Sequence, residues 1–477
     1  MAKKRGTEIW AKEMFGDAQF GDARLSSRLV RVASDLAGSI GSSPGRASGD
    51  DDSAAEAVYR FVRNERAKPS AIALAGFAAT AKQAASLEAL VCIEDTTALS
   101  FTHKVSSELG DLGGPEGTTA FGFFVHSALL LDARTGGTVG LVGQDYWMRD
   151  PTARGKRHQR KKRAYEDKES FKWQRMSEHL REQLGDELAA RVISTCDREA
   201  DIYEYLAFKT AGQERFVVRA SWDRNVEVDS EDEQGEGLDK HLFAVLGRAR
   251  KFGECEVQVP QRGGRPARKA MLTVRALRIH LRRPQRAKVG ALPKRIAVNA
   301  VLAREESPPP GVEALEWLLF TSEPVASNEE VLEVLRLYRL RWRIEEFHKA
   351  WKSGAGVERR RMQTAGNIER IAILLAFIAV RLLQLRERHD DNPEGSCTET
   401  LSAAEWKVLW VSIEKGRPPR KAPTIAWAYR AIARLGGWHD TKRTGRVGWD
   451  SYWLGWQKLQ ERIEGFEAAK VLTGARL

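Results

Sequence analysis

The sequence predicts a mixed α/β protein whose sheet is preceded and followed by helical segments. Three observations predict this class. Apolar runs that end in polar residues alternate with helical segments between about residues 89 and 221. Strand-like segments separated by turn residues occupy about 222–320. Apolar residues recur at helical spacing before residue 70 and after residue 388. We therefore expect an α/β core with an inserted antiparallel β subdomain, flanked by helical N- and C-terminal domains.

Length and charge narrow the class of protein. A chain of 477 residues is too long for one hydrophobic core, so two or three domains are expected. We place them at 1–70, 71–388 and 389–477, with the β insertion at about 222–320. Lys and Arg outnumber Asp and Glu by 77 to 65, which gives a net charge of +12. This excess favours a polyanionic partner without proving one.

Cysteine spacing and hydropathy indicate the cellular compartment in which the protein is expected. The four cysteines are scattered without a CxxC pair, so neither a zinc site nor a disulfide framework is suggested. A reducing, cytoplasmic compartment is the simplest expectation. The N-terminus lacks the apolar core of a signal peptide. The longest apolar run, at 371–380, is too short to span a bilayer and predicts a buried helix, so no membrane partner is expected.

The first 70 residues predict helices with a basic side. Arg24, Arg28 and Arg31 can lie along one side of a helix because they are spaced four and three apart. One interpretation is a small helical domain that binds DNA. The other is a solvated basic face on a helix bundle, and this segment alone does not separate them.

The central region predicts strands and then one long helix. The expected strands of the core are 89–101, 126–133, 138–148, 192–196 and 214–221. Those of the insertion are 254–261, 269–283 and 295–305. A helix is expected over 328–352, because Ser327 and Glu330 fit a capping box and Pro324 precedes them. The basic run at 156–163 predicts an exposed loop, and contact with phosphates is its functional interpretation.

Two carboxylates follow predicted strands. Asp95 comes after the strand VCI, and Asp197 comes after VISTC. The carboxyl ends of parallel strands face the crevice where α/β sheets bind ligands. Acidic residues at such positions are also often turn formers or helix caps, and Asp95 before two threonines fits that alternative. A third carboxylate converging there would require a counter-ion, and Mg²⁺ prefers such hard oxygen ligands.

The predicted long helix supplies a third carboxylate. Tyr338, Arg341, Glu345 and Lys352 are spaced three, four and seven apart, so they share one face. A phenol, two cations and one carboxylate suit a face that grips a phosphate backbone and presents one metal ligand. An apolar stripe marks the expected core side: Leu337, Leu340, Ile344, Phe347 and Trp351.

These motifs resemble those of a known family. The spacing Tyr338-x2-Arg341-x3-Glu345-x6-Lys352, with IEDTT at 93–97 and CDREAD at 196–201, resembles the insertion-sequence-four family of bacterial DDE transposases. The surrounding YRLRWRIEEFHKAWKSGAG resembles the transposon-five (IS-fifty) group of that family, and further segments resemble it in the same order. The resemblance implies a ribonuclease-H-like catalytic core whose β subdomain is inserted before the helix with the last acid.

The resemblance also assigns roles to residues. Asp95, Asp197 and Glu345 are implied as the catalytic acids that bind two Mg²⁺ ions per site. Mn²⁺ is expected to be able to replace Mg²⁺ there. Nearby acids are candidates for supporting or structural roles: Glu94, Glu199, Asp201 and Glu346. DNA contacts are implied at Tyr338, Arg341, Lys352, Arg219 and Arg28. Trp317 is implied to stack on a base flipped from the transposon end; its alternative is a core tryptophan in an apolar strand.

The implied activity is cut-and-paste transposition. Nicking, hairpin formation, hairpin opening and 3′-hydroxyl transfer into target DNA would occur at one site, in a homodimer bound to two inverted-repeat ends of double-stranded DNA. The expected place of action is the bacterial nucleoid. Leu25 and Ser221 stand where the group has basic residues, so the recognised end sequence stays open. Two other functions remain: a non-transposing metal nuclease on the same fold, and a catalytically silent DNA-binding regulator.

Overall fold

The computed structural model describes residues 2–38, 52–113, 120–149, 163–228, 240–259, 267–285, 292–441 and 447–473. Each of the three expected domains is represented in these ranges. The predicted basic run at 156–163 lies outside them except for Arg163, so its interpretation stays a prediction.

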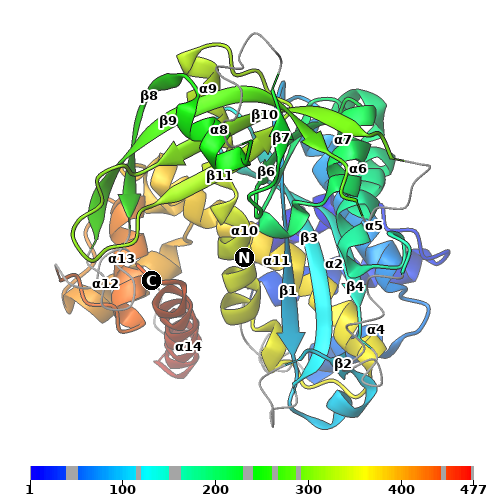
Figure 1. The fold of residues 1–477 in the computed structure, drawn as a ribbon. Coiled ribbons are helices and arrows are strands. Elements are labelled where there is room, and N and C mark those ends of the chain that lie inside the picture. Colours follow the sequence, from blue (N-terminus) through cyan, green and yellow to red (C-terminus); the bar gives the residue numbers. More distant parts are fainter. Residues whose placement is uncertain are drawn as a thin grey trace.

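One mixed sheet organises the described part of the chain (Figure 1). Its strand order is β2-β3-β1-β5-β6-β11-β10-β9-β7, and β4 and β8 pair with β3 and β9. The strands of the first half are β1 Leu90–Ser100, β2 Gly110–Asp111, β3 Phe121–Asp132, β4 Thr138–Trp147, β5 Val192–Cys196 and β6 Arg215–Arg219. Those of the second half are β7 Val226–Glu227, β8 Lys251–Val259, β9 Arg268–Arg282, β10 Arg295–Arg304 and β11 Glu316–Thr321.

Strand β1 lies at the centre of the core sheet. It pairs antiparallel with β3 and parallel with β5, and β5 pairs parallel with β6. The five core strands expected from the sequence are therefore all present. Their mixed order, with three antiparallel strands beside two parallel ones, is consistent with the expected ribonuclease-H-like core. Only Leu90–Ile93 of β1 pair with β5, so the carboxyl end of β5 lies beside the middle of β1.

The inserted β segment is antiparallel, as predicted, but it does not form a sheet of its own. β8, β9 and β10 pair in sequence order, and β11 joins them to β6 of the core. A short helix, α8 Leu242–Arg248, was not predicted within this segment. A separate subdomain therefore stays a prediction, since backbone hydrogen bonds run from the core into the insertion.

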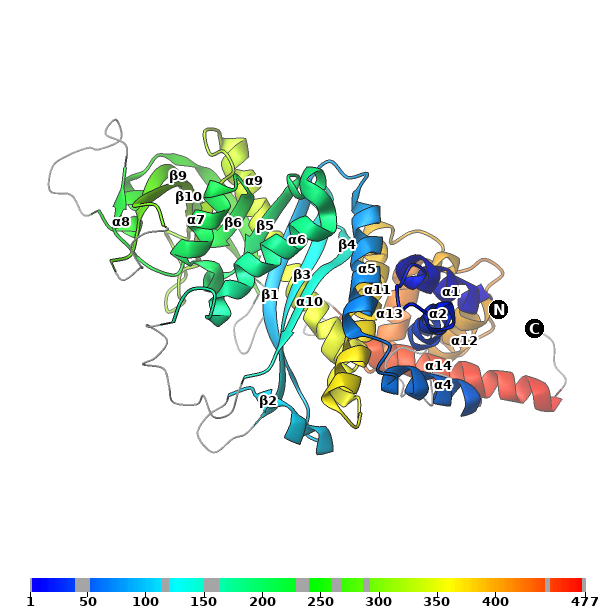
Figure 2. The same cartoon turned by 90° about the vertical axis from the view of Figure 1, so that its right-hand side faces the viewer.

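Helices cover the sheet and extend beyond it. The N-terminal ones are α1 Ala2–Phe15, α2 Ala23–Gly38, α4 Asp52–Arg63 and α5 Pro69–Ala84. Those beside the sheet are α6 Lys172–Ala189, α7 Tyr203–Ala211 and α11 Ala365–Asp391. The C-terminal ones are α12 Ala403–Glu414, α13 Ile425–Leu435 and α14 Trp449–Thr473. Figure 2 shows α5 and α11 between the sheet and the terminal helices.

The N-terminal helices share a core with α11. The rings of Phe15 and Phe377 meet edge to face, with centroids 5.4 Å apart, and both are buried in the same hydrophobic cluster. The division at residue 70 is therefore not marked by separate cores and stays a prediction. The apolar run at 371–380 forms the buried middle of α11, as expected. No helix in the described residues is long and apolar enough to cross a membrane.

The predicted helix over 328–352 is not one regular helix. Its start is as expected, with Ser327 and Glu330 forming a capping box. It is then divided into α9 Asn328–Leu340, α10 Trp342–Lys349 and a π-helical turn over Ala350–Gly354. The tightening lies at Arg341, whose N–H bonds the carbonyl of Tyr338 three residues back. Regular 3.6-residue periodicity therefore describes only approximately the predicted helix face that carries Tyr338, Arg341, Glu345 and Lys352.

The close approach of α5 and α11 depends on a glycine. A Cβ at Gly76 would lie 2.2 Å from Cζ of Phe377, which is 1% exposed. We expect Gly76→Ala to lower the free energy of unfolding by about 1–3 kcal/mol, because the buried ring cannot move aside. Urea unfolding measures this. Gly247→Ala in α8 is the control, since a Cβ there meets nothing within 4 Å. Wild-type stability of Gly76→Ala would contradict the packing described.

Candidate active site

Alternation along β1 separates two neighbouring carboxylates. Val91 and Ile93 face the cluster that contains α11, whereas Leu90 and Cys92 face the cluster beneath α6. Asp95 continues the first series, and its Oδ2 lies 3.7 Å from Nδ1 of His348 on α10. Glu94 continues the second series and bonds His126 on β3. The fold thus points Asp95 toward α10 and turns Glu94 away from it.

Asp197 ends the strand beside β1. Ile93 of β1 pairs with Thr195 of β5, so the segments that carry the two aspartates are adjacent. Asp95 does not follow its strand as predicted but lies within β1, because β1 continues to Ser100 in its pairing with β3. Asp197 caps a 3-10 turn, and its Oδ1 accepts the N–H of Glu199 at 2.8 Å. The predicted cap role and a role in a site are therefore compatible for this residue.

Glu345 comes from α10 and is held by an arginine. Its Oε1 accepts a hydrogen bond from Nη2 of Arg341 at 2.9 Å. Burial raises the pKa values of both Asp95 and Asp197, and the charge of Arg341 opposes this rise. This guanidinium therefore lies among three carboxylates that come from β1, the end of β5 and α10.

The three carboxylates are linked electrostatically. Burial, reinforced by the negative charges of Asp197 and Glu345, raises the pKa of Asp95 from 3.8 to about 7 against the opposing charge of Arg341. Burial also raises the pKa of Asp197. An acid that retains its proton near neutral pH has too little positive charge around it to stabilise the carboxylate.

A metal ion fits the donor set, although the ligands are not gathered around one point. Among the described residues, no three His, Cys, Asp or Glu side chains are grouped closely enough to hold a metal ion. Two physical reasons apply: like charges repel, and Glu345 is bonded to Arg341. Three hard oxygen donors that lack a counter-charge suit Mg²⁺ or Mn²⁺. Metal binding by Asp95, Asp197 and Glu345 stays a prediction.

Comparison with protein families agrees with this site. A family model described as a transposase DNA-binding domain matches residues 7–67, and one described as a transposase DDE domain matches residues 144–381. The chain belongs to the DDE transposases. The DDE match contains Asp197 and Glu345, whereas Asp95 lies outside it. The case for Asp95 in this transposase therefore depends on β1 lying beside β5.

One predicted DNA contact is more buried than its role requires. Tyr338 is 6% exposed and belongs to the hydrophobic core, contrary to the expectation that its helix face is unsuited to packing. Its ring meets Trp317 at 5.9 Å in an edge-to-face arrangement. Trp317 itself is partly buried against the same core. The aromatic rings support each other, so a DNA contact of Tyr338 could involve only its hydroxyl end.

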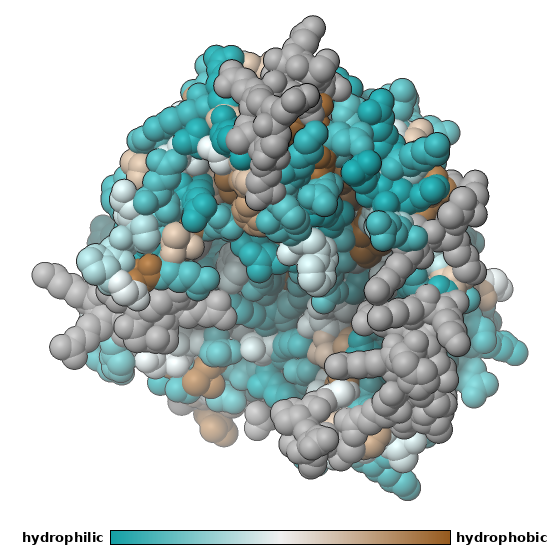
Figure 3. All heavy atoms as spheres, in the orientation of Figure 1, coloured by the Kyte–Doolittle hydropathy of each residue, from teal (hydrophilic) through white to brown (hydrophobic). Residues whose placement is uncertain are grey.

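The other predicted contacts lie at the surface or close to it. Arg28 is exposed on α2, at the border of the side that buries Leu25 and Leu29. Nη2 of Arg219 donates to the carbonyl of Glu316 at 3.0 Å. Lys352 is partly exposed in the π-helical turn, 4.0 Å from Glu358. Figure 3 shows a mostly hydrophilic hollow at the centre of the face that Figure 1 presents. Residues at these positions are accessible to DNA, and their contact with DNA stays a prediction.

Sequence reasoning missed two residues near the acids. His348 is buried beside Asp95, and burial lowers its pKa to about 3, so the imidazole is neutral. Lys172 is 7% exposed, lies 2.8 Å from Glu199, and its charge lowers the pKa of Asp197. The spacing of three from Glu345 to His348 could have indicated a shared helix side. No sequence signal connects Lys172 to the site.

The raised pKa of Asp95 predicts a stabilising substitution. Above pH 7 the folded protein holds an ionised Asp95 at a cost that the unfolded chain does not have. Stability is therefore lost as pH rises between 3.8 and about 7. In chelator at pH 8, we expect Asp95→Asn to raise the free energy of unfolding by at most about 4 kcal/mol. The gain should shrink toward pH 4. Urea unfolding at both pH values measures this.

Asp132→Asn is the matched control, with the opposite sign. Partial burial acts to raise the pKa of Asp132, but hydrogen bonds from Thr135 and from the backbone of Arg134 lower it. Its carboxylate contributes stability that is lost as pH falls, so Asp132→Asn should destabilise the protein at pH 8. A destabilising effect of Asp95→Asn at pH 8 would contradict the electrostatic account of the site.

Proposed function

We propose that this DDE transposase performs cut-and-paste transposition as a member of the insertion-sequence-four family, in the transposon-five (IS-fifty) group. The observation that carries the proposal is the electrostatic coupling of Asp95 to Asp197 and Glu345: burial, together with these two negative charges, raises the pKa of Asp95 to about 7. The resemblance of the three motifs and the DNA-binding match at residues 7–67 support it. The proposed place of action is the bacterial nucleoid in the cytoplasm.

The three acids have a shared role in this proposal. Asp95, Asp197 and Glu345 would hold two Mg²⁺ ions, which activate a water or a sugar hydroxyl and stabilise the leaving oxygen of a phosphodiester. Asp95 lies within β1 and Asp197 directly follows β5, while Glu345 lies on a helix and is partly exposed. Arg341 is the natural partner of a phosphate oxygen once DNA arrives, because a guanidinium binds carboxylate and phosphate with the same fork of donors.

One site would serve all four steps, since each is an in-line displacement at phosphorus. Water nicks the transposon end and leaves a 3′-hydroxyl. That hydroxyl attacks the opposite strand and forms a hairpin, which water opens. The freed 3′-hydroxyl then attacks target DNA. We place a homodimer on two inverted-repeat ends, with Arg28, Arg219 and Lys352 at phosphates.

Trp317 has a defined part in the hairpin step. A hairpin requires a sharply bent strand, and unstacking a base costs a few kcal/mol. An aromatic platform can return about 1–3 kcal/mol of that cost. Trp317 suits this part because it is only partly buried and its ring is braced by Tyr338.

The reaction class can be tested with the element's own DNA. A duplex of the inverted repeat that flanks the coding segment should give a nick, a hairpin and a blunt end in sequence when Mg²⁺ is added. A nuclease would cut the duplex without 3′-hydroxyl strand transfer. A silent regulator would bind the duplex and leave it intact.

The helix face predicts which of two adjacent glutamates is essential. Glu345→Gln should abolish cleavage, by a factor of about 10³ or more, because a lost ligand removes several kcal/mol of charge stabilisation. Binding of the end duplex should remain. Glu346→Gln is the control, since Glu346 bonds Arg343 instead. Gel assays of cleavage and binding measure both variants, and equal cleavage by both would contradict the assignment.

Trp317 predicts a defect confined to one step. Trp317→Ala should nick at the wild-type rate and form the hairpin about ten-fold or more slowly, because about 1–3 kcal/mol of stacking is lost. Denaturing gels that resolve nick and hairpin over time measure this. Trp410→Ala is the control, because Trp410 packs on Trp427 in the C-terminal helices. Unaltered hairpin yield in Trp317→Ala would refute the stacking role.

A further inference from the structure

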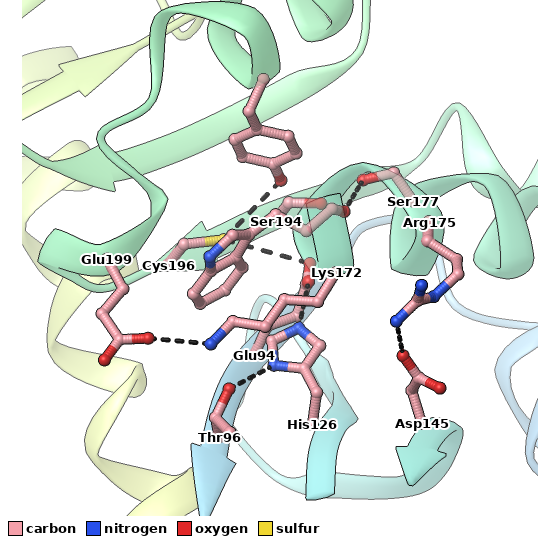
Figure 4. A network of polar contacts seen from close by, with 12 residues as sticks. Glu94, Thr96, His126, Asp145, Lys172, Arg175, Ser177, Ser194, Cys196 and Glu199 are labelled. Atoms are coloured by element: carbon pink, nitrogen blue, oxygen red, sulfur yellow. Dashed lines mark hydrogen bonds and ion pairs between the residues drawn. The ribbon is translucent and has the colours of Figure 1, made fainter. Parts of the chain in front are cut away.

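A buried polar pair lies on the face of the sheet opposite the three acids. Glu94 on β1 and His126 on β3 are both 0% exposed. Nε2 of His126 lies 3.3 Å from Oε2 of Glu94 (Figure 4). A carboxylate can only accept, so the ring N–H donates to it. The reaction proposed above uses neither side chain.

The same imidazole binds both neighbours of Asp95 in the chain. Nδ1 of His126 lies 3.0 Å from Oγ1 of Thr96, which pairs with His126 across the strands. Because side chains alternate along β1, Glu94 and Thr96 point to one face and Asp95 points to the other. The imidazole therefore fixes the backbone immediately before and after Asp95.

The pair also reaches the strand that carries Asp197. Sγ of Cys196 lies 4.0 Å from Oε1 of Glu94, and Cys196 directly precedes Asp197. This is a weak hydrogen bond, but it is fully buried on both sides. One carboxylate thus contacts residues adjacent to two of the three acids, on β1 and at the end of β5.

The surroundings make this arrangement stiff. The edge of His126 packs on Trp173 with ring centroids 4.6 Å apart, and Trp173 is 1% exposed. In such a dry environment a polar group that loses its partner costs the full desolvation penalty. The side chains therefore have one favourable arrangement, which sets the register of β1 on β3.

We propose that Glu94 and His126 form a positioning pair, which holds Asp95 and Asp197 in the geometry that divalent ions require. The inference rests on the proposed function, since it assigns the pair to the same metal-dependent site. Groups that hydrogen-bond metal ligands commonly change metal affinity about 10–100-fold when they are replaced. Glu94 and His126 act one step further out, through the chain neighbours of Asp95 and Asp197.

Two substitutions of nearly equal size separate positioning from bulk packing. Glu94→Gln keeps a carbonyl oxygen that accepts from His126, whereas Glu94→Met removes the acceptor. We expect Glu94→Met to weaken Mn²⁺ binding by about ten-fold or more and to raise the Mg²⁺ concentration for half-maximal cleavage equally. Glu94→Gln should restore most of both. Calorimetric titration of Mn²⁺ into the protein bound to a pre-cleaved end duplex that lacks the 3′-hydroxyl measures affinity without cleavage or strand transfer, and Glu345→Gln is the ligand-loss reference.

Glu323→Met is the control for a lost buried carboxylate. Glu323 is 8% exposed and accepts a hydrogen bond from Nε of Arg215 at 3.0 Å, and Arg215 begins β6 at the end of the sheet away from the acids. The Glu323→Met variant should lose stability and keep wild-type affinity for Mn²⁺. Should Glu94→Met fail to fold, Thr96→Val is the second variant. It removes one hydrogen bond to His126 and should weaken Mn²⁺ binding several-fold.

The outcomes separate the two proposals. Wild-type Mn²⁺ affinity in folded Glu94→Met, or in Thr96→Val where the first does not fold, would overturn the positioning role and leave the proposed function standing. A wild-type protein that neither binds Mn²⁺ at this site nor cleaves the end duplex would overturn the proposed function and this inference together. Weaker binding in Glu94→Met with recovery in Glu94→Gln supports the positioning pair.

Discussion

Repulsion among three carboxylates is the constraint on which the rest of this structure depends. Asp95 lies within β1 and Asp197 directly follows the neighbouring strand β5, so the sheet limits how far they can move apart. Burial strengthens the repulsion, because water does not screen the charges. The fold thus retains a locally unfavourable arrangement, as functional sites commonly do.

The protein offsets this repulsion with its own cations. Arg341 bonds Glu345 and opposes the rise that burial causes in the pKa of both aspartates, and Lys172 does the same at Asp197. These cations come from α10 and α6, on elements that the sheet brings together. The proposed chemistry requires that phosphates compete for Arg341 and that divalent ions take its place. Binding of DNA and of metal would then reinforce each other. A phosphate that binds Arg341 frees Glu345 for the metal, and a metal that binds the acids frees Arg341 for the phosphate.

Sequence patterns predicted most of the elements but few of the contacts between them. Apolar runs located the strands because buried strands require them, and the capping box located Ser327 because its signal is local. The joining of β11 to β6 depends on distant pairing, which no local pattern records. The break at Arg341 escaped prediction because the residues on both sides retain helical periodicity.

The same limit applies to the site. Helical spacing separated Glu345 from Glu346, and the strand ends indicated Asp95 and Asp197. The burial of Tyr338 was not foreseen, because a phenol is classed as polar while its ring packs on Trp317. Lys172 reaches the acids through tertiary packing alone, whereas His348 lies three residues after Glu345 on α10, a spacing that could have indicated it. The alternation that turns Glu94 toward His126 was readable in β1, but its partner on β3 was not.

The most direct test of the central claim is a crystal structure of the transposase bound to an end duplex and Mn²⁺, with anomalous scattering used to locate the metal. The account predicts Mn²⁺ bound by oxygen atoms of Asp95, Asp197 and Glu345, with Glu345 released from Arg341. Mn²⁺ bound elsewhere, with Glu345 still paired to Arg341 beside the bound end, would contradict it.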